Sequence, residues 1–190
     1  MIYADHAATT KISETAKLAM LSAMEKDWYN PSSLYTPGQQ TSGTLMDARV
    51  RIARCLGCLP KEIYFTSGGS EADNQAILSA AAIGKRQGKM HIISTAFEHH
   101  AVLHTLKKLE KEGFEITLLD VGEKGIVSPA QVEKAIRPDT ALVTVMYANN
   151  EIGTIQPIRE IGAVCRQNGV LFHTDAVQAA GHLPINVKDD

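Results

Sequence analysis

Polar residues that can bind a phosphorylated ligand follow several short apolar segments of the sequence. Thr66-Ser-Gly-Gly-Ser70 lies between a predicted strand and a predicted helix. Backbone N–H groups at a helix N-terminus, with serine hydroxyls and the positive end of the helix dipole, bind phosphate. The segment lacks the G-x-G-x-x-G pattern of dinucleotide sites and the G-x-x-x-x-G-K-[ST] pattern of P-loops. It is compatible with a phosphorylated ligand other than a nucleotide, although by itself a glycine turn capped by Ser70 is the commoner explanation.

An acidic residue and an amide follow the apolar segment 169–172, which we predict to be a buried strand. In open α/β sheets, ligands bind outside the carboxyl ends of the strands. A carboxylate there must be paired, solvated or turned toward a cation. By itself Asp175 is more commonly a turn residue. The alternative is that Asp175 keeps a ring nitrogen of the ligand protonated, with Gln178 nearby.

A histidine and an asparagine occupy similar positions after two other apolar segments. His99 can lie against a flat aromatic ligand and transfer a proton near neutral pH, or it can be an ordinary core or surface histidine. Asn150 offers amide donors, or it belongs to a polar turn. His100 and His104 have the i, i+4 spacing of a metal pair. No third ligand lies near them in the sequence, so we predict no metal site.

Taken together, these groups are the ones that pyridoxal phosphate requires. The phosphate would bind at the turn that ends in Ser70. Asp175 would keep the pyridinium nitrogen protonated, so that the ring can act as an electron sink. His99 would stack on the ring, and Asn150 and Gln178 would form hydrogen bonds with its phenolic oxygen or with the substrate.

The elements that position these residues alternate between strands and helices from about residue 62 onward. We predict strands at 63–66, 90–94, 114–119, 140–147 and 169–172, and helices at 13–26, 41–56, 71–85, 98–107, 128–136 and 158–168. This alternation predicts an α/β fold with a mostly parallel sheet covered by helices. We expect residues 1–60 to form an N-terminal arm with helices and residues 61–190 to form the ligand-binding domain.

The composition is that of an ordinary globular domain. The chain has 190 residues, 44% of them hydrophobic and 21% charged, and a net charge of −2. This charge gives no general electrostatic reason to expect nucleic acid or an anionic membrane as a partner. No segment approaches the ~20 apolar residues of a membrane span, and the N-terminus lacks a signal-peptide pattern. We therefore expect a cytoplasmic protein.

The three cysteines do not indicate a disulfide framework, because their number is odd and no signal peptide is recognisable. Cys55 and Cys58 form a C-x-x-C pair at the end of a predicted helix. A zinc site would need a second pair of ligands. We interpret these two residues and Cys165 as structural or incidental thiols.

In this order, the motifs resemble the class V aminotransferase-like family, and within it the cysteine desulfurases of the IscS/NifS-like group. The resemblance covers essentially the whole chain. It rests on Tyr3–Thr10, Asn30–Ser33, Phe65–Asn74, Glu98-His99, Asn149–Gly153 and His173–Gln178.

The resemblance implies a fold-type I enzyme that depends on pyridoxal phosphate and is usually a homodimer. Such enzymes take sulfur from L-cysteine, release L-alanine and pass the sulfur as a persulfide to an acceptor or scaffold protein, for iron–sulfur cluster or thio-cofactor assembly. By matching positions, it implies a phosphate turn at Gly69, Ser70 and Glu71, a stacking and catalytic histidine at His99, amides at Asn150 and Gln178, and a pyridinium partner at Asp175. Other class V enzymes, such as a selenocysteine lyase, and a non-catalytic scaffold are the alternatives.

The family's Ser-x-His-Lys segment, which carries the Schiff-base lysine, does not occur in the sequence, and Lys188 does not match it. The family's persulfide-forming cysteine and carboxylate-binding arginine also have no match. We therefore expect a large domain that is incomplete at its C-terminal end and inactive alone. An exposed sheet edge and apolar surface would favour its self-association.

Overall fold

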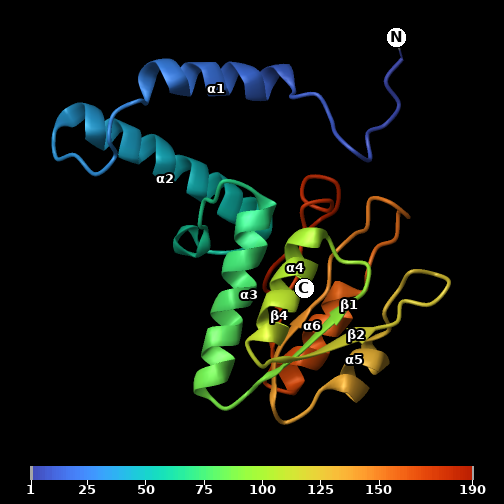
Figure 1. Cartoon of the computed structure of the whole chain (residues 1–190). Coiled ribbons are helices and arrows are strands. Elements are labelled where there is room, and N and C mark those ends of the chain that lie inside the picture. The colour runs from blue at the N-terminus through green and yellow to red at the C-terminus, as the bar shows by residue number, and fades with distance from the viewer. Residues whose placement is uncertain (1, 190) are drawn as a thin grey trace. The chain divides into compact units, whose positions relative to one another are not determined.

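The computed structural model describes residues 2–189. These residues form two compact units, which are described separately. The first comprises the chain up to Tyr64 together with Asn186–Lys188, and the second comprises Phe65–Ile185 with Asp189. Figure 1 shows the order of the elements along the chain. Within the described chain, no helix has both the length and the apolar character needed to span a bilayer.

The first unit contains the helices α1 (Glu14–Lys26) and α2 (Thr36–Leu56). The predicted N-cap of α1 is confirmed, because the Ser13 hydroxyl accepts a hydrogen bond from the Ala16 N–H at 3.2 Å. α2 begins five residues earlier than predicted. Pro37 lies in its first turn, where the proline nitrogen needs no hydrogen-bond partner.

The surface of α1 is exposed along its whole length, and none of its residues is buried. The large apolar side chains of α1 that remain exposed are Leu18, Met20, Leu21 and Met24. The adjoining Trp28 is 68% exposed and stacks on Tyr29, with ring centroids 4.0 Å apart. The unit therefore presents much apolar surface.

The predicted strand at 63–66 is wrong. The chain forms a short 3₁₀ helix, Pro60–Glu62, in which the Glu62 carboxylate accepts a hydrogen bond from the Leu59 N–H at 2.7 Å. Residues 63–66 then follow without joining the four described strands. A strand needs a neighbour for its hydrogen-bonded ladder, and apolar residues alone do not provide one. Tyr64 is accordingly 80% exposed.

The second unit is built on a four-stranded sheet in the order β2-β1-β3-β4, with every neighbouring pair parallel. The strands are β1 (His91–Thr95), β2 (Glu115–Leu119), β3 (Thr140–Thr144) and β4 (Leu171–His173). β4 is an edge strand of this sheet, and Leu171 is 47% exposed, so it is less buried than predicted. The central strands β1 and β3 are fully buried.

Helices cover both faces of the sheet. α3 (Gly69–Arg86) and α4 (His100–Lys111) pack on one face, and α5 (Pro129–Ala135) and α6 (Ile158–Gln167) pack on the other (Figure 1).

Side chains alternate between the two faces along the central strands. Ile92 and Leu142 join the core beneath α3 and α4, whereas Ile93 and Val143 join the core beneath α5 and α6. This alternation follows from the two-residue period of a strand. The predicted α/β fold with a parallel sheet covered by helices is confirmed.

α3 lies unusually close to the sheet at Gly84. A Cβ atom added there would overlap the Cβ of Ala141 on β3 and would lie 3.1 Å from the carbonyl oxygen of Lys89. Only glycine allows so close an approach of this helix to β3. The contact fixes the C-terminal half of α3 against the amino end of the strand.

A buried histidine joins three strands at the opposite end of the sheet from the pocket described below. The Nδ1 and Nε2 atoms of His91 each lie 2.8 Å from a threonine hydroxyl, that of Thr140 on β3 and that of Thr117 on β2. The His91 side chain is fully buried. Burial is the main reason that its pKa is lowered, followed by the charge of Arg137.

Candidate active site

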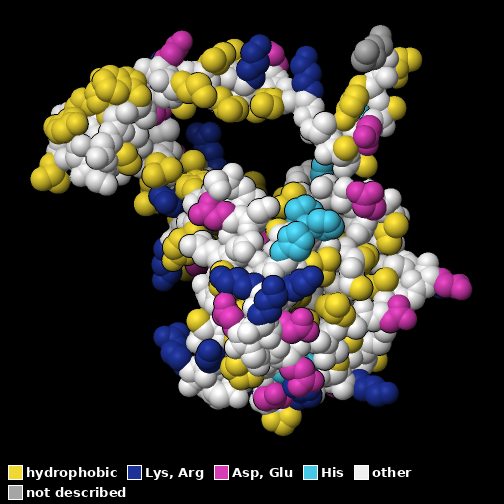
Figure 2. All heavy atoms as spheres, viewed as in Figure 1, with side chains coloured by type: hydrophobic (Ala, Val, Ile, Leu, Met, Phe, Trp, Pro, Cys, Tyr) yellow, Lys and Arg dark blue, Asp and Glu magenta, His cyan; other side chains and the backbone are white. Residues whose placement is uncertain are grey.

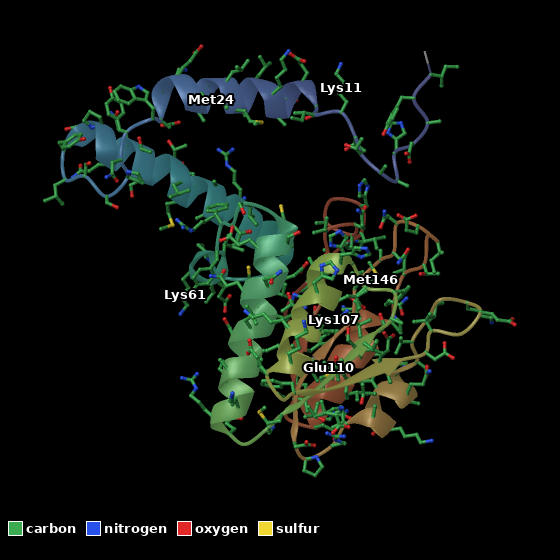
Figure 3. All side chains as sticks on the ribbon, viewed as in Figure 1. Lys11, Met24, Lys61, Lys107, Glu110 and Met146 are labelled. Atoms are coloured by element: carbon green, nitrogen blue, oxygen red, sulfur yellow. The ribbon has the colours of Figure 1, made fainter. Side chains whose placement is uncertain are left out.

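The candidate site lies at the carboxyl ends of β1, β3 and β4. The chain passes from β1 to β2 on one side of the sheet and later continues through β3 to β4 on the other. Ligands of open α/β sheets bind at such a reversal of strand order. A pocket occurs there, near the labelled Met146 of Figure 3, and its lining residues are Gly69, Ser70, Asp73, His99, Met146, Asn150, Asp175, Val177 and Gln178.

Most of the site residues predicted from the sequence meet in this pocket, although they come from four separate segments. These residues are Gly69, Ser70, His99, Asn150, Asp175 and Gln178. Glu71 is the exception. Its carboxylate accepts hydrogen bonds from the Ser67 N–H at 2.7 Å and the Ser67 hydroxyl at 2.6 Å. These bonds lower the pKa of Glu71, so the residue shapes the turn and does not line the pocket.

The N-terminus of α3 forms one wall of the pocket. No side chain caps this helix, whose N-cap residue is Gly68. Its first N–H groups are therefore suited to an anion. A Cβ atom on Gly69 would lie 2.7 Å from Cγ2 of Val177, so glycine is needed for the turn to approach the segment after β4. The Ser70 hydroxyl adds a polar group beside these amides.

His99 is the N-cap of α4, and the hydrogen bond that its side chain makes with the helix backbone fixes the orientation of its ring. The Nδ1 atom accepts a hydrogen bond from the Ala101 N–H at 3.1 Å. A neutral His99 must therefore carry its proton on Nε2. The side chain is exposed and lines the pocket. Its ring also belongs to a surface group with His100 and His104, visible among the histidines of Figure 2, with successive ring centroids 6.1 and 5.4 Å apart.

Asp175 is both a turn residue and a pocket residue. Its Oδ1 atom accepts a hydrogen bond from the Val177 N–H at 3.0 Å, which is the turn function considered from the sequence. The residue is only 7% exposed and still lines the pocket. Its backbone oxygen accepts a bond from the Tyr147 N–H at 2.8 Å, which ties the segments after β3 and β4 together.

The loop after β3 is shaped by Asn149, the residue before the predicted Asn150. The Oδ1 atom of Asn149 accepts hydrogen bonds from the N–H groups of Glu151 and Ile152, at 2.9 and 3.1 Å. Its Nδ2 atom donates to the carbonyl oxygen of Phe97 at 3.3 Å. Asn149 is buried, and this network leaves Asn150 to line the pocket.

Sequence reasoning missed Asp73, a second acidic residue of the pocket. Asp73 is 4% exposed, and its pKa is raised to about 6, chiefly by burial and then by the charge of Asp175. The signal was present, because Asp73 lies three residues after Ser70 and therefore shares its side of α3. Met146 and Val177, which supply the apolar lining, were also missed.

Glu98 connects the carboxyl ends of β1 and β3. Its Oε1 atom accepts hydrogen bonds from the Thr95 hydroxyl at 2.6 Å and from the Met146 N–H at 3.0 Å. Its Oε2 atom is buried and has no hydrogen-bond partner among the described residues. Burial is the main cause that raises the pKa of Glu98, to about 7. Glu98 therefore holds together the two segments that carry His99 and Met146.

The residues of the pocket fit pyridoxal phosphate. A phosphate needs uncapped N–H groups and a hydroxyl, which α3 and Ser70 provide. A protonated ring nitrogen needs a buried carboxylate, and Asp175 is one. His99, Asn150 and Gln178 supply polar groups around the remaining edge. Among residues 2–189, no three metal-binding side chains gather into a possible metal site.

Comparison with known proteins identifies the family that this fold and pocket define. Residues 2–189 match the family described as aminotransferase class-V, and the chain belongs to this family. Class V aminotransferases and cysteine desulfurases depend on pyridoxal phosphate.

The most similar relatives belong to one group within this family. The chain is 51% identical to the cysteine desulfurase IscS of Methanosarcina thermophila, with 98% of this chain and 46% of that protein covered. It is 52% identical to the putative cysteine desulfurase IscS 1 of Bacillus subtilis strain 168, with 99% of this chain and 49% of that protein covered. The chain thus spans about half the length of these curated relatives. The family resemblance found in the sequence is confirmed.

Solved structures agree with these comparisons. The chain superimposes on the structure of SspA in complex with cysteine with a TM-score of 0.93 and 40% identity, covering 98% of this chain and 54% of that one. It superimposes on a NifS-like protein with a TM-score of 0.92 and 34% identity, covering 97% of this chain and 51% of that one. The fold-type I assignment therefore rests on both sequence and structure.

The three cysteines lie outside the residues that line the pocket. Cys165 is buried in α6, and burial raises the pKa of its thiol to about 12. Such a thiol is a poor nucleophile near neutral pH. Cys55 is exposed near the end of α2, and Cys58 follows that helix. All three are free thiols, and the structure gives none of them a place in the candidate site.

Proposed function

We propose that this chain is the cofactor-binding part of a cysteine desulfurase, which converts L-cysteine to L-alanine and a protein persulfide. The observation that carries the proposal is the pocket, where a buried carboxylate and an uncapped helix N-terminus lie together. The names of the relatives support the same activity. The cysteine bound to SspA, a structural neighbour, supports cysteine as the substrate.

In this proposal the chain's own residues bind and orient pyridoxal phosphate. The first N–H groups of α3 and the Ser70 hydroxyl hold the phosphate. Asp175 holds a proton on the ring nitrogen, and the Val177 N–H keeps that carboxylate in place. When bound, the cofactor supplies an electron sink for the bonds at the substrate's α-carbon.

His99 is the proposed catalytic residue. Its ring is oriented by the bond from the Ala101 N–H, so the Nε2 atom can donate a proton at the pocket. Imidazole is a common general acid and base in enzymes, so the same atom can also take the proton back. Asn150 and Gln178 are the proposed hydrogen-bond partners of the ring oxygen or of the substrate.

The test is the affinity of the purified chain for pyridoxal phosphate, measured by ligand absorbance and compared with pyridoxal, which lacks the phosphate. Ser70→Ala should weaken binding of pyridoxal phosphate roughly tenfold or more and leave pyridoxal unchanged, since hydrogen bonds to charged groups contribute about 1.5–3 kcal/mol. Asp175→Asn should weaken binding of both ligands. Ser79→Ala, on the exposed part of α3, is the matched control. Equal affinities in all three variants would contradict the proposed site.

The activity of the whole protein requires a separate test. We propose that it acts on L-cysteine as a cytoplasmic homodimer and passes sulfur to an acceptor or scaffold protein. The exposed apolar residues of α1 support burial against further protein surface. Alanine release from L-cysteine, compared with release from L-selenocysteine, would separate a desulfurase from a selenocysteine lyase. Sedimentation analysis of the whole protein would report its oligomeric state.

A further inference from the structure

The side-chain amide of Asn74 joins α3 to α4, which lie side by side next to the pocket (Figure 1). Its Nδ2 atom donates to the carbonyl oxygen of Ser70 on α3 at 2.8 Å and to that of Ala101 on α4 at 3.4 Å. Its Oδ1 atom accepts a hydrogen bond from the Thr105 hydroxyl of α4 at 2.7 Å. A carbonyl oxygen can only accept, so these partners determine which end of the amide carries the hydrogens.

The two carbonyl partners of Asn74 belong to residues that shape the pocket. The Ser70 hydroxyl is the proposed phosphate ligand at the first turn of α3. The Ala101 N–H donates to Nδ1 of His99 at 3.1 Å and orients that ring. Asn74 therefore connects the phosphate-binding turn to the residue that holds the His99 ring.

Thr105 holds the Asn74 amide in place from α4. Its side chain is 3% exposed, and its hydroxyl lies 2.7 Å from Oδ1 of Asn74 and 2.8 Å from the carbonyl oxygen of Ala101. The single hydroxyl hydrogen can be donated to either oxygen. Replacing Asn74 therefore leaves the buried hydroxyl with an acceptor, so the cost of the change to the fold is small.

The apolar packing of these two helices does not depend on the amide. Ile77 of α3 and Val102 and Leu106 of α4 are buried in one core cluster against the sheet. Asn74 is only half-buried and lines a cleft between the helices together with His99. The apolar side chains therefore keep α3 and α4 together, and the amide fixes their relative position at the end beside the pocket.

We propose that Asn74 is a positioning residue that sets the distance between the phosphate-binding turn of α3 and the ring of His99. A ligand that carries both a phosphate and a flat ring depends on this distance, because its two parts must bind at the same time. A ligand that has only one of these parts does not depend on it. The identity of the spanning ligand as pyridoxal phosphate rests on the proposed function, whereas the hydrogen bonds that position His99 do not.

The first experiment compares the Kd values of pyridoxal phosphate, pyridoxal and inorganic phosphate. Asn74→Leu keeps the size of the side chain without its hydrogen bonds. It should weaken the binding of pyridoxal phosphate about tenfold and change the Kd of each smaller probe by less than about twofold. Gln75→Leu replaces an exposed amide on the same helix and is the matched control, which should leave all three values unchanged.

Changes at Thr105 test the same amide from the other helix. Thr105→Val removes the hydroxyl and should also weaken pyridoxal phosphate selectively, whereas Thr105→Ser keeps the hydroxyl and should retain the affinity. An equal loss for all three probes would indicate general damage to the fold, and a loss for inorganic phosphate would indicate a direct phosphate contact. Either result, or an unchanged affinity for pyridoxal phosphate in Asn74→Leu, would overturn the positioning role.

The second experiment needs no ligand and measures the hydrogen exchange of the Ala101 N–H by NMR. Asn74→Leu should accelerate this exchange by about two- to tenfold relative to Gln75→Leu, because the bond to Nδ1 of His99 is held less firmly. An unchanged rate would overturn the link between Asn74 and His99. If pyridoxal phosphate does not bind to the wild type, the proposed function fails, and the exchange rate still decides whether Asn74 positions His99.

Discussion

Replacing Gly84 with alanine should separate α3 from the sheet. The added Cβ atom would overlap the Cβ of Ala141 and lie 3.1 Å from the carbonyl oxygen of Lys89. Neither obstacle can rotate away, because one atom is fixed to the backbone of β3 and the other is a backbone atom. The helix or the strand must therefore shift.

The magnitude follows from two opposing terms. Forcing an extra methyl group into a well-packed core costs about 1–3 kcal/mol, and the rigid neighbours at Gly84 favour the upper end of this range. Alanine is better than glycine in a helix by about 1 kcal/mol. We expect Gly84→Ala to lower the free energy of unfolding by about 2 kcal/mol, as the difference of these terms.

Urea unfolding followed by circular dichroism would measure this change. Gly43→Ala is the matched control, because Gly43 is an exposed helical glycine in α2 whose added Cβ would meet nothing within 4 Å. It should be neutral or stabilising. The double variant Gly84→Ala with Ala141→Gly should recover stability relative to the sum of the single changes, because it removes the overlapping atom. A fully stable Gly84→Ala, or a strictly additive double variant, would refute the reasoning.

Three further predictions concern buried polar groups and a helix cap. The pKa of His91 is lowered in the folded protein. The contribution of this residue to stability is therefore present above its unfolded pKa of about 6.5 and is lost as the pH falls through the native value. Urea unfolding midpoints should fall more between about pH 7 and pH 5 in the wild type than in His91→Gln. Gln156→Ala should lower the free energy of unfolding by about 1–3 kcal/mol, measured by thermal unfolding. The reason is that the buried Gln156 side chain accepts a hydrogen bond from the Val127 N–H and donates one to the Gly125 carbonyl oxygen. Ser128→Ala should cost about 1 kcal/mol in the same assay, because Ser128 caps α5, and Ser128→Asp should retain the cap.

The sequence predicted the parallel sheet well because its signals are local. Apolar segments, glycine turns and caps such as Ser128 depend on nearby residues. The predicted helix at 41–56 begins five residues too late, because the polar residues before it gave no apolar pattern, whereas Pro37 is compatible with the first helical turn. The predicted strand at 63–66 failed because strand formation depends on a distant neighbour, which a local pattern does not specify.

The site was predicted from the same local signals, with two instructive exceptions. Glu71 was placed at the phosphate turn by family matching, but its bonds to Ser67 determine where its carboxylate points. Asp73 was not predicted, because its significance comes from its proximity to His173 and Asp175, roughly a hundred residues later in the chain. The sequence therefore indicates where a site lies more readily than it indicates the charge that the site carries.

The exposure of α1 has a consequence for helix–coil equilibrium. A helix of 13 residues without buried side chains depends on its caps and its intrinsic propensity alone. Isolated helices shorter than about 12–15 residues are marginal in water, because nucleation is unfavourable and few residues follow the nucleus. The helical state of α1 should therefore depend on whether another protein surface covers it. Its helicity can report on assembly, independently of the pocket and of any bound cofactor.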